Sequence, residues 1–193
     1  MESVSLEEKI SKKILKYLSI DNQFNKIDQI KISYGLSIFI INTIKLISIY
    51  LLAYIYNCIY ITFITHISFY IIRRYAYGAH AKKSYICTFL GIFMFVILPN
   101  FVSYIYIDTK SLIIINLLNF FILGIYAPAK TKKNTIGDNS KIKKCKIKAM
   151  FNNFLILLFI IWINNISISV LIVLGSSLAV LLVTPISYKL LEE

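Results

Sequence analysis

Charged residues are scarce in this chain of 193 amino acids, at 16% of the total, whereas soluble domains hold about 25%. Hydrophobic residues make up 58% of the sequence, and the mean hydropathy is +0.73. This balance excludes an ordinary soluble domain. It indicates a chain that is embedded in a membrane through several apolar segments.

Several signatures of chemistry are also missing. The three cysteines, Cys58, Cys87 and Cys145, lie far apart and suggest no disulfide framework, and no Cys-x-x-Cys or closely spaced His/Cys set indicates a metal site. A Gly-rich phosphate loop is absent as well. The first thirty residues are charged and lack the apolar core of a signal peptide. We therefore expect no cofactor and no metal, and we expect the first apolar segment to act as the insertion signal.

Basic residues are distributed unevenly between six apolar segments. Nearly all Lys and Arg residues lie before the first segment, between the second and third, between the fourth and fifth, or after the sixth. The positive-inside rule then places both termini and both basic loops in the cytoplasm. Anionic headgroups account for the net charge of +12, so no nucleic acid partner is expected. We predict an all-α, multi-pass protein of the cell membrane with about six transmembrane helices, at 34–56, 57–72, 86–107, 111–127, 150–163 and 166–188.

The predicted domains are a cytoplasmic segment at 1–33 and a transmembrane domain at 34–190, with basic cytoplasmic loops at 73–84 and 128–149. The first segment alternates lysines with apolar residues at helical spacing, which predicts an amphipathic helix on the membrane surface. A soluble cap on the bundle is the alternative. The apolar residues concerned are Ile10, Ile14, Leu15 and Leu18.

Two of the six segments are short. The stretches 57–72 and 150–163 approach the length at which an apolar run forms a re-entrant piece, of about 10–14 residues. Four spans with two re-entrant segments is therefore the alternative topology. We favour six, because Asn57 and Asn164–Asn165 mark turns that would divide the longer apolar regions into helix pairs.

The stretch from Arg73 to Cys87 combines a histidine with a cysteine beside a basic loop. Ser84 is a natural N-cap, which would place Cys87 at the third position of the next helix. The helix N-terminus and the adjacent lysines would stabilise a thiolate there, and the free amides could face an oxyanion. A cysteine in a span is, however, more often a small buried residue.

His80 is the candidate acid–base partner of this cysteine. Residues seven apart on one helix are separated by about 10.5 Å, whereas a hydrogen bond needs about 2.6–3.2 Å. The chain must therefore fold back around Gly78, or the histidine must come from another subunit. His80 could instead be an interfacial residue. His66 is a rival base that more often would form a helix–helix hydrogen bond, and Cys145 has flanking lysines but no nearby histidine.

Two motifs resemble the accessory gene regulator protein B family of Gram-positive bacteria. One is Gly78-Ala79-His80-Ala81 with a cysteine seven residues after the histidine; the other is Tyr126-Ala127-Pro128-Ala129 followed by Thr131-Lys132-Lys133. Size and span layout agree too. The resemblance implies a membrane cysteine endopeptidase, acting as a homodimer, that processes a precursor signal peptide in quorum sensing. It also implies that His80 and Cys87 are catalytic.

The chain departs from the family pattern at two places. Tyr77 stands where many relatives have a first glycine, and Asn134-Thr135-Ile136-Gly137 stands where relatives often have prolines. By resemblance the precursor has an acidic tail, which basic residues could hold unless they serve topology alone. The predicted substrate-binding residues are Arg73, Arg74, Lys82, Lys83, Lys130, Lys132 and Lys133.

Two other classes of function stay open. Lys45 and His66 lie inside apolar segments, and intramembrane ionisable residues often line a transport path. The chain could therefore be a non-enzymatic peptide exporter. A purely structural membrane partner is the third possibility.

Overall fold

The computed structural model describes residues 13, 25–79, 84–129, 138–163 and 165–192. The predicted N-terminal amphipathic helix lies outside these residues. The chain divides into two compact units, Met1–Ser48 and Ile49–Glu193, and each is described by itself.

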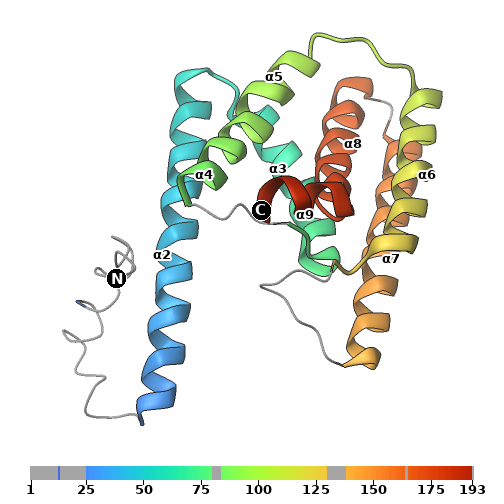
Figure 1. Cartoon of the computed structure of the whole chain (residues 1–193). Coiled ribbons are helices and arrows are strands. Elements are labelled where there is room, and N and C mark those ends of the chain that lie inside the picture. Colours follow the sequence, from blue (N-terminus) through green and yellow to red (C-terminus); the bar gives the residue numbers. More distant parts are fainter. Residues whose placement is uncertain (1–12, 14–24, 80–83, 130–137, 164, 193) are drawn as a thin grey trace. The chain divides into compact units, whose positions relative to one another are not determined.

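All the regular structure in the described residues is helical, which confirms the all-α prediction (Figure 1). Each of the six predicted apolar segments falls on a helix or on consecutive helical pieces. The elements are α2 (Lys26–Ile55), α3 (Ile59–Ala76), α4 (Ser84–Ile92), the π-helical turn η2 (Phe93–Ile97), α5 (Leu98–Val102), α6 (Thr109–Tyr126), α7 (Asn139–Trp162), α8 (Ile166–Leu181) and α9 (Pro185–Glu192).

Four helical segments of the described chain are long and apolar enough to cross a membrane: Lys26–Ile55, Tyr85–Val102, Thr109–Tyr126 and Asn139–Trp162. A fifth arises if α8 and α9, which meet at 73°, count as one broken span. Helix α3 is not among them, so a protein of several spans is supported but the predicted number of six is not confirmed.

Short polar side chains cap the starts of α6, α7 and α8 in the second unit. Asp108 accepts a hydrogen bond from the Ser111 amide at α6, and Asp138 accepts one from the Ser140 amide at α7. Asn165 does the same for α8, which confirms the predicted turn at this residue. The turn predicted at Asn57 is confirmed as well, since it lies between α2 and α3 with a φ of 52°.

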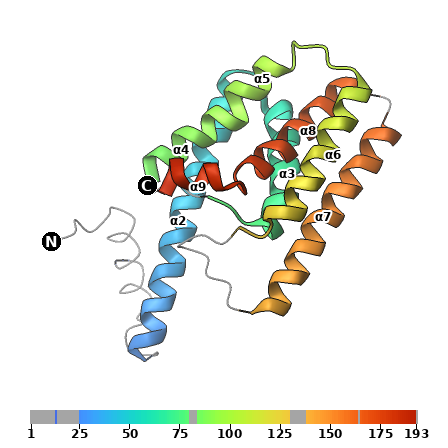
Figure 2. The same ribbon diagram turned by 45° about the vertical axis from the view of Figure 1, so that its right-hand side comes forward.

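Four helices of this unit form a closed bundle, in which α3 packs on α8, α8 on α6, α6 on α7, and α7 on α3 (Figures 1 and 2). Buried polar side chains link them inside an apolar core. Asn153 Nδ2 donates to Asn116 Oδ1 at 3.1 Å between α7 and α6, and Asn119 Nδ2 donates to Ser177 Oγ at 2.8 Å between α6 and α8. Such hydrogen bonds fix which helices pair where surrounding lipid gives no hydrophobic drive.

The helical run α4–η2–α5 packs against α3 and α8 in the same unit. Phe95 in the π-helical turn is buried and stacks on His66, with ring centroids 4.5 Å apart. His66 Nδ1 also lies 3.3 Å from the Tyr50 hydroxyl oxygen. The interpretation of His66 as a helix–helix contact is therefore confirmed.

Candidate active site

The end of α3 is held by an arginine from its own last turn. Arg73 donates to the carbonyl of Tyr77 at 2.7 Å, of Gly78 at 3.0 Å and of Ala79 at 2.6 Å. These three residues leave the helix and lead directly to His80. One guanidinium group, with its five fixed donors, can satisfy several carbonyls at once. The predicted substrate-binding role of Arg73 stays a prediction; its guanidinium group already organises this loop.

Two successive residues of this loop adopt left-handed backbone angles. Tyr77 has a φ of 54° and a ψ of −151°, and Gly78 has a φ of 138°. The first conformation is nearly restricted to glycine, and a residue with a side chain there costs about 1–3 kcal/mol. A Cβ atom on Gly78 would lie 1.8 Å from Arg73 Nη1 and 2.6 Å from the Leu182 carbonyl oxygen. The loop thus requires glycine at 78 and tolerates Tyr77 under strain.

The two motifs of the sequence analysis meet at this point, which we call the motif junction (Ala76–Ala79 and Ala127–Ala129). The Ala129 amide donates to the Ala76 carbonyl at 2.9 Å. The Ala79 amide donates to the Leu182 carbonyl, at the end of α8, at 2.8 Å. Gly78, Ala79 and all of Ala127–Ala129 are buried. The ends of α3, α6 and α8 therefore come together where the chain leads into His80 and Lys130.

Tyr77 points toward α7, where Cys145 is buried. Partial burial raises the pKa of the Tyr77 phenol, and the neighbouring Cys145 thiol, which interacts with it, adds to the rise. The phenol is therefore neutral at physiological pH. Its ring packs on the apolar core, which offsets part of the backbone strain at this residue.

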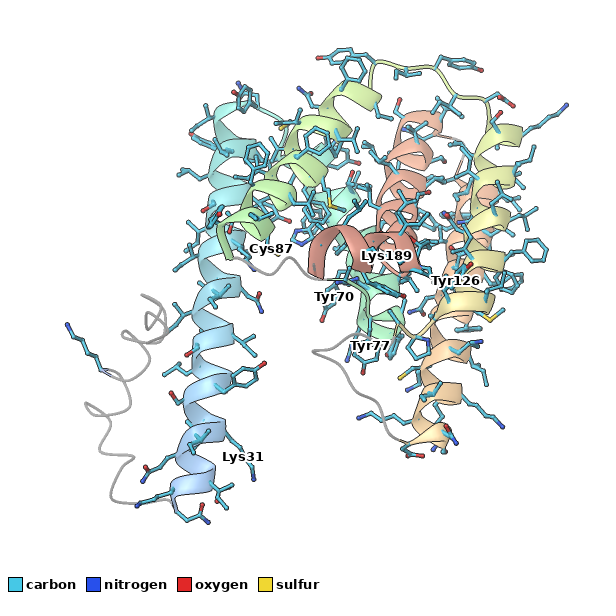
Figure 3. The ribbon with its side chains drawn as sticks, in the orientation of Figure 1. Lys31, Tyr70, Tyr77, Cys87, Tyr126 and Lys189 are labelled. Carbon is cyan, nitrogen blue, oxygen red and sulfur yellow. The ribbon has the colours of Figure 1, made fainter. Side chains whose placement is uncertain are left out.

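Cys87 lies near the N-terminus of α4, as predicted, and its side chain is partly buried (Figure 3). The helix includes Ser84 as its first residue, so Cys87 is the fourth helical residue rather than the third. It is a free thiol. A helix N-terminus favours a negative charge at such a position. Figure 3 also labels Tyr77 and Tyr126, at the ends of α3 and α6 that form the motif junction.

Other predicted site residues fall outside the described residues: His80, Lys82, Lys83, Lys130, Lys132 and Lys133. The predicted dyad of His80 and Cys87 is thus neither brought together nor separated by the structure. Arg74 is described and exposed, with its guanidinium carbon 5.6 Å from the centroid of the Tyr75 ring.

Two residues that shape the junction carry no clear signal in the sequence. Leu182 offers its carbonyl to the loop that leads to the histidine, and nothing in an apolar run of α8 signals this. Lys146 donates to the Gly124 carbonyl at 2.7 Å and so satisfies a free carbonyl at the end of α6. The lysine-rich stretch before Met150 was predicted as loop, but from Asn139 onward it is part of α7.

Replacing Arg73 with glutamine is expected to loosen the loop ahead of the histidine. Hydrogen bonds from a charged donor are worth about 1.5–3 kcal/mol each, although three in one cluster are not additive. We expect amide exchange at Ala79 to accelerate by roughly tenfold or more. Hydrogen exchange followed by mass spectrometry measures this. An Arg74→Gln variant, which removes the same charge one residue away, should leave that rate unchanged; equal acceleration in both variants would contradict the assignment.

Comparison with known proteins adds a second line of evidence. The family model described as "Accessory gene regulator B" matches residues 7–183. An accessory gene regulator protein B from Staphylococcus aureus (strain MRSA252) is 41% identical over 120 residues, which cover 62% of this chain and 64% of that protein. One from Staphylococcus saprophyticus subsp. saprophyticus is 32% identical over 150 residues, covering 78% of this chain and 79% of that protein.

The chain thus spans less than two thirds of the length of the Staphylococcus aureus relatives that it matches. No solved structure matches it. The family model nevertheless covers nearly the whole sequence, including both motifs that meet at the junction. This chain therefore belongs to the accessory gene regulator B family.

Proposed function

We propose that this protein is a membrane cysteine endopeptidase of quorum sensing. It removes the C-terminal tail of a precursor signal peptide and promotes cyclisation of the remainder to a thiolactone autoinducer. The observation that carries the proposal is the motif junction, because it joins the loop leading to His80 with the Tyr-Ala-Pro segment that the family resemblance also singles out.

The proposed reaction has two steps. In the first, the Cys87 thiolate attacks a peptide carbonyl, the carbon–nitrogen bond breaks, and protonated His80 gives its proton to the leaving amine. The tail departs and an acyl-thioester remains on Cys87. In the second, a cysteine thiolate of the bound peptide attacks this thioester, closes the ring and releases the Cys87 thiolate. The exchange of one thioester for another in the second step is nearly balanced in free energy. Forming the first thioester from an amide is uphill, so removal of the released tail must drive the first step.

The charges on α7 support binding of an acidic tail. Lys141, Lys143 and Lys144 are exposed in its first two turns, where the positive end of the helix dipole disfavours cations. Among the described residues, Asp138 at the cap supplies one carboxylate against these three lysines. Residues that break a local rule without compensation commonly serve a function. We propose that these lysines, together with the sequence-predicted Lys130, Lys132 and Lys133, attract the tail. The substrate-binding role of Arg73, Arg74, Lys82 and Lys83 stays a prediction.

The proposed topology has six spans with both termini in the cytoplasm. The hydrogen bonds of the motif junction support it, because they bring the ends of α3, α6 and α8 to one end of the bundle. That end carries the basic residues of α7, as the positive-inside rule requires of a cytoplasmic face. We further propose a homodimer, in which His80 acts on Cys87 of the same or of the other subunit.

The exporter alternative rested on Lys45 and His66 as polar lining. His66 instead lies between the Tyr50 hydroxyl and the Phe95 ring, within a packed cluster of the second unit. A side chain engaged in this way is accounted for by packing. We therefore do not propose transport as the primary function.

The test is a processing assay with the full-length protein in lipid vesicles. Purified wild type, Cys87→Ala, His80→Ala and Cys145→Ala are incubated with the precursor peptide, and mass spectrometry follows tail release and acyl-enzyme. Loss of a nucleophile or its base typically lowers turnover by roughly 10⁴-fold or more. We expect that loss for the first two variants. The Cys145 variant is the control, since it removes a buried thiol that the mechanism does not use.

Equal processing by all four proteins would overturn the proposal. If the wild type releases no tail, whereas its vesicles move peptide across the membrane and a His66→Ala variant does not, the protein is an exporter instead. A Cys87→Ser protein that still closes the ring would contradict the thioester step in particular.

A further inference from the structure

Two cations from different helices meet on one aromatic ring at the end of α3. The guanidinium carbon of Arg74 lies 5.6 Å from the centroid of the Tyr75 ring, and Lys148 Nζ lies 5.3 Å from the same centroid. Each contact is attractive, and together they hold two positive charges beside one ring, no more than about 11 Å apart. Neither Arg74 nor Lys148 forms an ion pair with another described residue. The ion pair found among the described residues joins Lys31 to Asp28, in α2. The site therefore favours an anion.

The position of these cations along their helices fixes their depth. Lys148 is the last cation of α7, and only apolar residues and two asparagines follow it up to Trp162. Arg74 lies in the last turn of α3, beyond the apolar part of that helix. Both side chains are exposed. Cations at the end of an apolar run lie at the level of the lipid headgroups.

A largely apolar surface, interrupted by Asn152, continues from the two cations toward the membrane interior. On α7, Asn152 and Leu155 follow the lysine at helical spacing; on α3, Ile71 and Ile67 precede the aromatic ring in the same way. Asn152 Nδ2 donates to the Ile71 carbonyl at 2.9 Å, which joins the two helices along this seam. Leu155 and Ile67 are each 46% exposed and Ile71 is 39% exposed. The seam thus offers a basic end and an apolar length.

We propose that this α3–α7 seam binds an anionic phospholipid of the cytoplasmic leaflet. The phosphate lies between Arg74 and Lys148, and an acyl chain lies along Ile71, Ile67 and Leu155. The guanidinium group can hold two phosphate oxygens at once, and the ammonium group adds a point charge from the other helix. A bound anion relieves the repulsion between the two cations. Basic pockets between transmembrane helices on the cytoplasmic side bind such headgroups.

An acidic peptide is the other anion to consider, and the position of the seam disfavours it. An acidic peptide that approaches from water would first meet the exposed side chains of Lys141, Lys143 and Lys144, near the start of α7. Burying its flanking polar backbone along apolar side chains would leave amides without partners. An acyl chain suits that surface, so the phospholipid explains both halves of the seam.

Native mass spectrometry of the full-length protein in detergent tests the proposal. The protein is titrated with phosphatidylglycerol and with phosphatidylcholine of the same acyl chains. Wild type is expected to retain the first lipid in preference. Each cation near an anionic headgroup contributes a factor of about five, so Arg74→Gln with Lys148→Gln should weaken phosphatidylglycerol binding roughly 25-fold. The control, Lys141→Gln with Lys143→Gln, removes the same charge nearby and should leave binding unchanged.

Arg74→Lys adds a test of geometry, because it keeps the charge and loses the planar fork. We expect phosphatidylglycerol binding between that of wild type and that of the double variant. If the double variant does not fold, a weaker preference of Arg74→Lys for phosphatidylglycerol over phosphatidylcholine, compared with wild type, supports the proposal. Three results would overturn the proposal. They are unchanged phosphatidylglycerol binding by both Arg74→Lys and the double variant, a loss of binding in the control as large as in the double variant, and retention of phosphatidylcholine by wild type equal to that of phosphatidylglycerol. So would equal displacement by soluble glycerol phosphate, which would indicate a free-phosphate site, or by an acidic peptide.

Discussion

A Gly78→Ala variant is expected to insert and fold, yet to lose nearly all tail release, by roughly a hundredfold or more. The added methyl group would lie 1.8 Å from Arg73 Nη1 and 2.6 Å from the Leu182 carbonyl oxygen, in a backbone conformation with φ near +138°. The arginine side chain can move, but the Leu182 backbone cannot do so without shifting the end of α8. The loop must therefore change course, and it carries His80 only two residues later.

Tyr77→Gly provides the matched comparison at the adjacent residue. Glycine relieves the unfavourable backbone angles of Tyr77, by about 1–3 kcal/mol, and loses the contacts of a partly buried ring. The relief of backbone strain and the loss of ring contacts largely offset each other in the stability of the loop. The loop should therefore keep its conformation, and we expect a rate of tail release within about threefold of wild type. The vesicle assay with mass spectrometry measures both variants. A Gly78→Ala protein that processes as fast as wild type would show that the loop conformation is not needed for catalysis.

The helices were predictable from the sequence because apolar runs of sufficient length have few other structures available in lipid. The start of α7 was not. Its lysines read as a basic loop, since charge indicates topology more directly than it indicates conformation. Lysine is nevertheless a good helix former, and the Asp138 cap starts the helix eleven residues before the apolar run at Met150 would. In this stretch the charge predicted a cytoplasmic loop, whereas the helix propensity of lysine favoured a helix.

The site was predictable to a lesser degree. Cys87 in a first helical turn followed from Ser84, a residue type that begins helices. The role of Arg73 did not follow, because a cation at a helix end has the same sequence signature whether it faces lipid, substrate or its own backbone. Its three carbonyl contacts depend on the left-handed angles of Tyr77 and Gly78. A tyrosine gives no sign of such angles.

Gly175→Ala is expected to destabilise the protein by about 3 kcal/mol, the upper end of the usual cost of overpacking. The new Cβ atom would lie 2.2 Å from the Thr65 carbonyl oxygen, 2.9 Å from Ser68 Oγ and 3.1 Å from the Phe69 amide nitrogen. Two of these atoms belong to the α3 backbone, so the clash is relieved only if α3 and α8 move apart. Small residues permit this kind of close helix approach in membranes. Unfolding in mixed micelles measures the change.

Gly124→Ala is the matched control on α6, because its Cβ atom would meet only the Met150 side chain, at 3.5 Å and 3.9 Å. Both variants gain the same helix propensity, about 1 kcal/mol, so the difference between them isolates the clash. Adding Ser68→Ala to Gly175→Ala removes the hydroxyl but leaves the Thr65 carbonyl in place, and we therefore expect no recovery of stability. Full recovery would mean that side chains, rather than the two backbones, set the distance between α3 and α8. Since the Leu182 carbonyl at the end of α8 holds Ala79 beyond the end of α3, separation of these helices should also slow tail release.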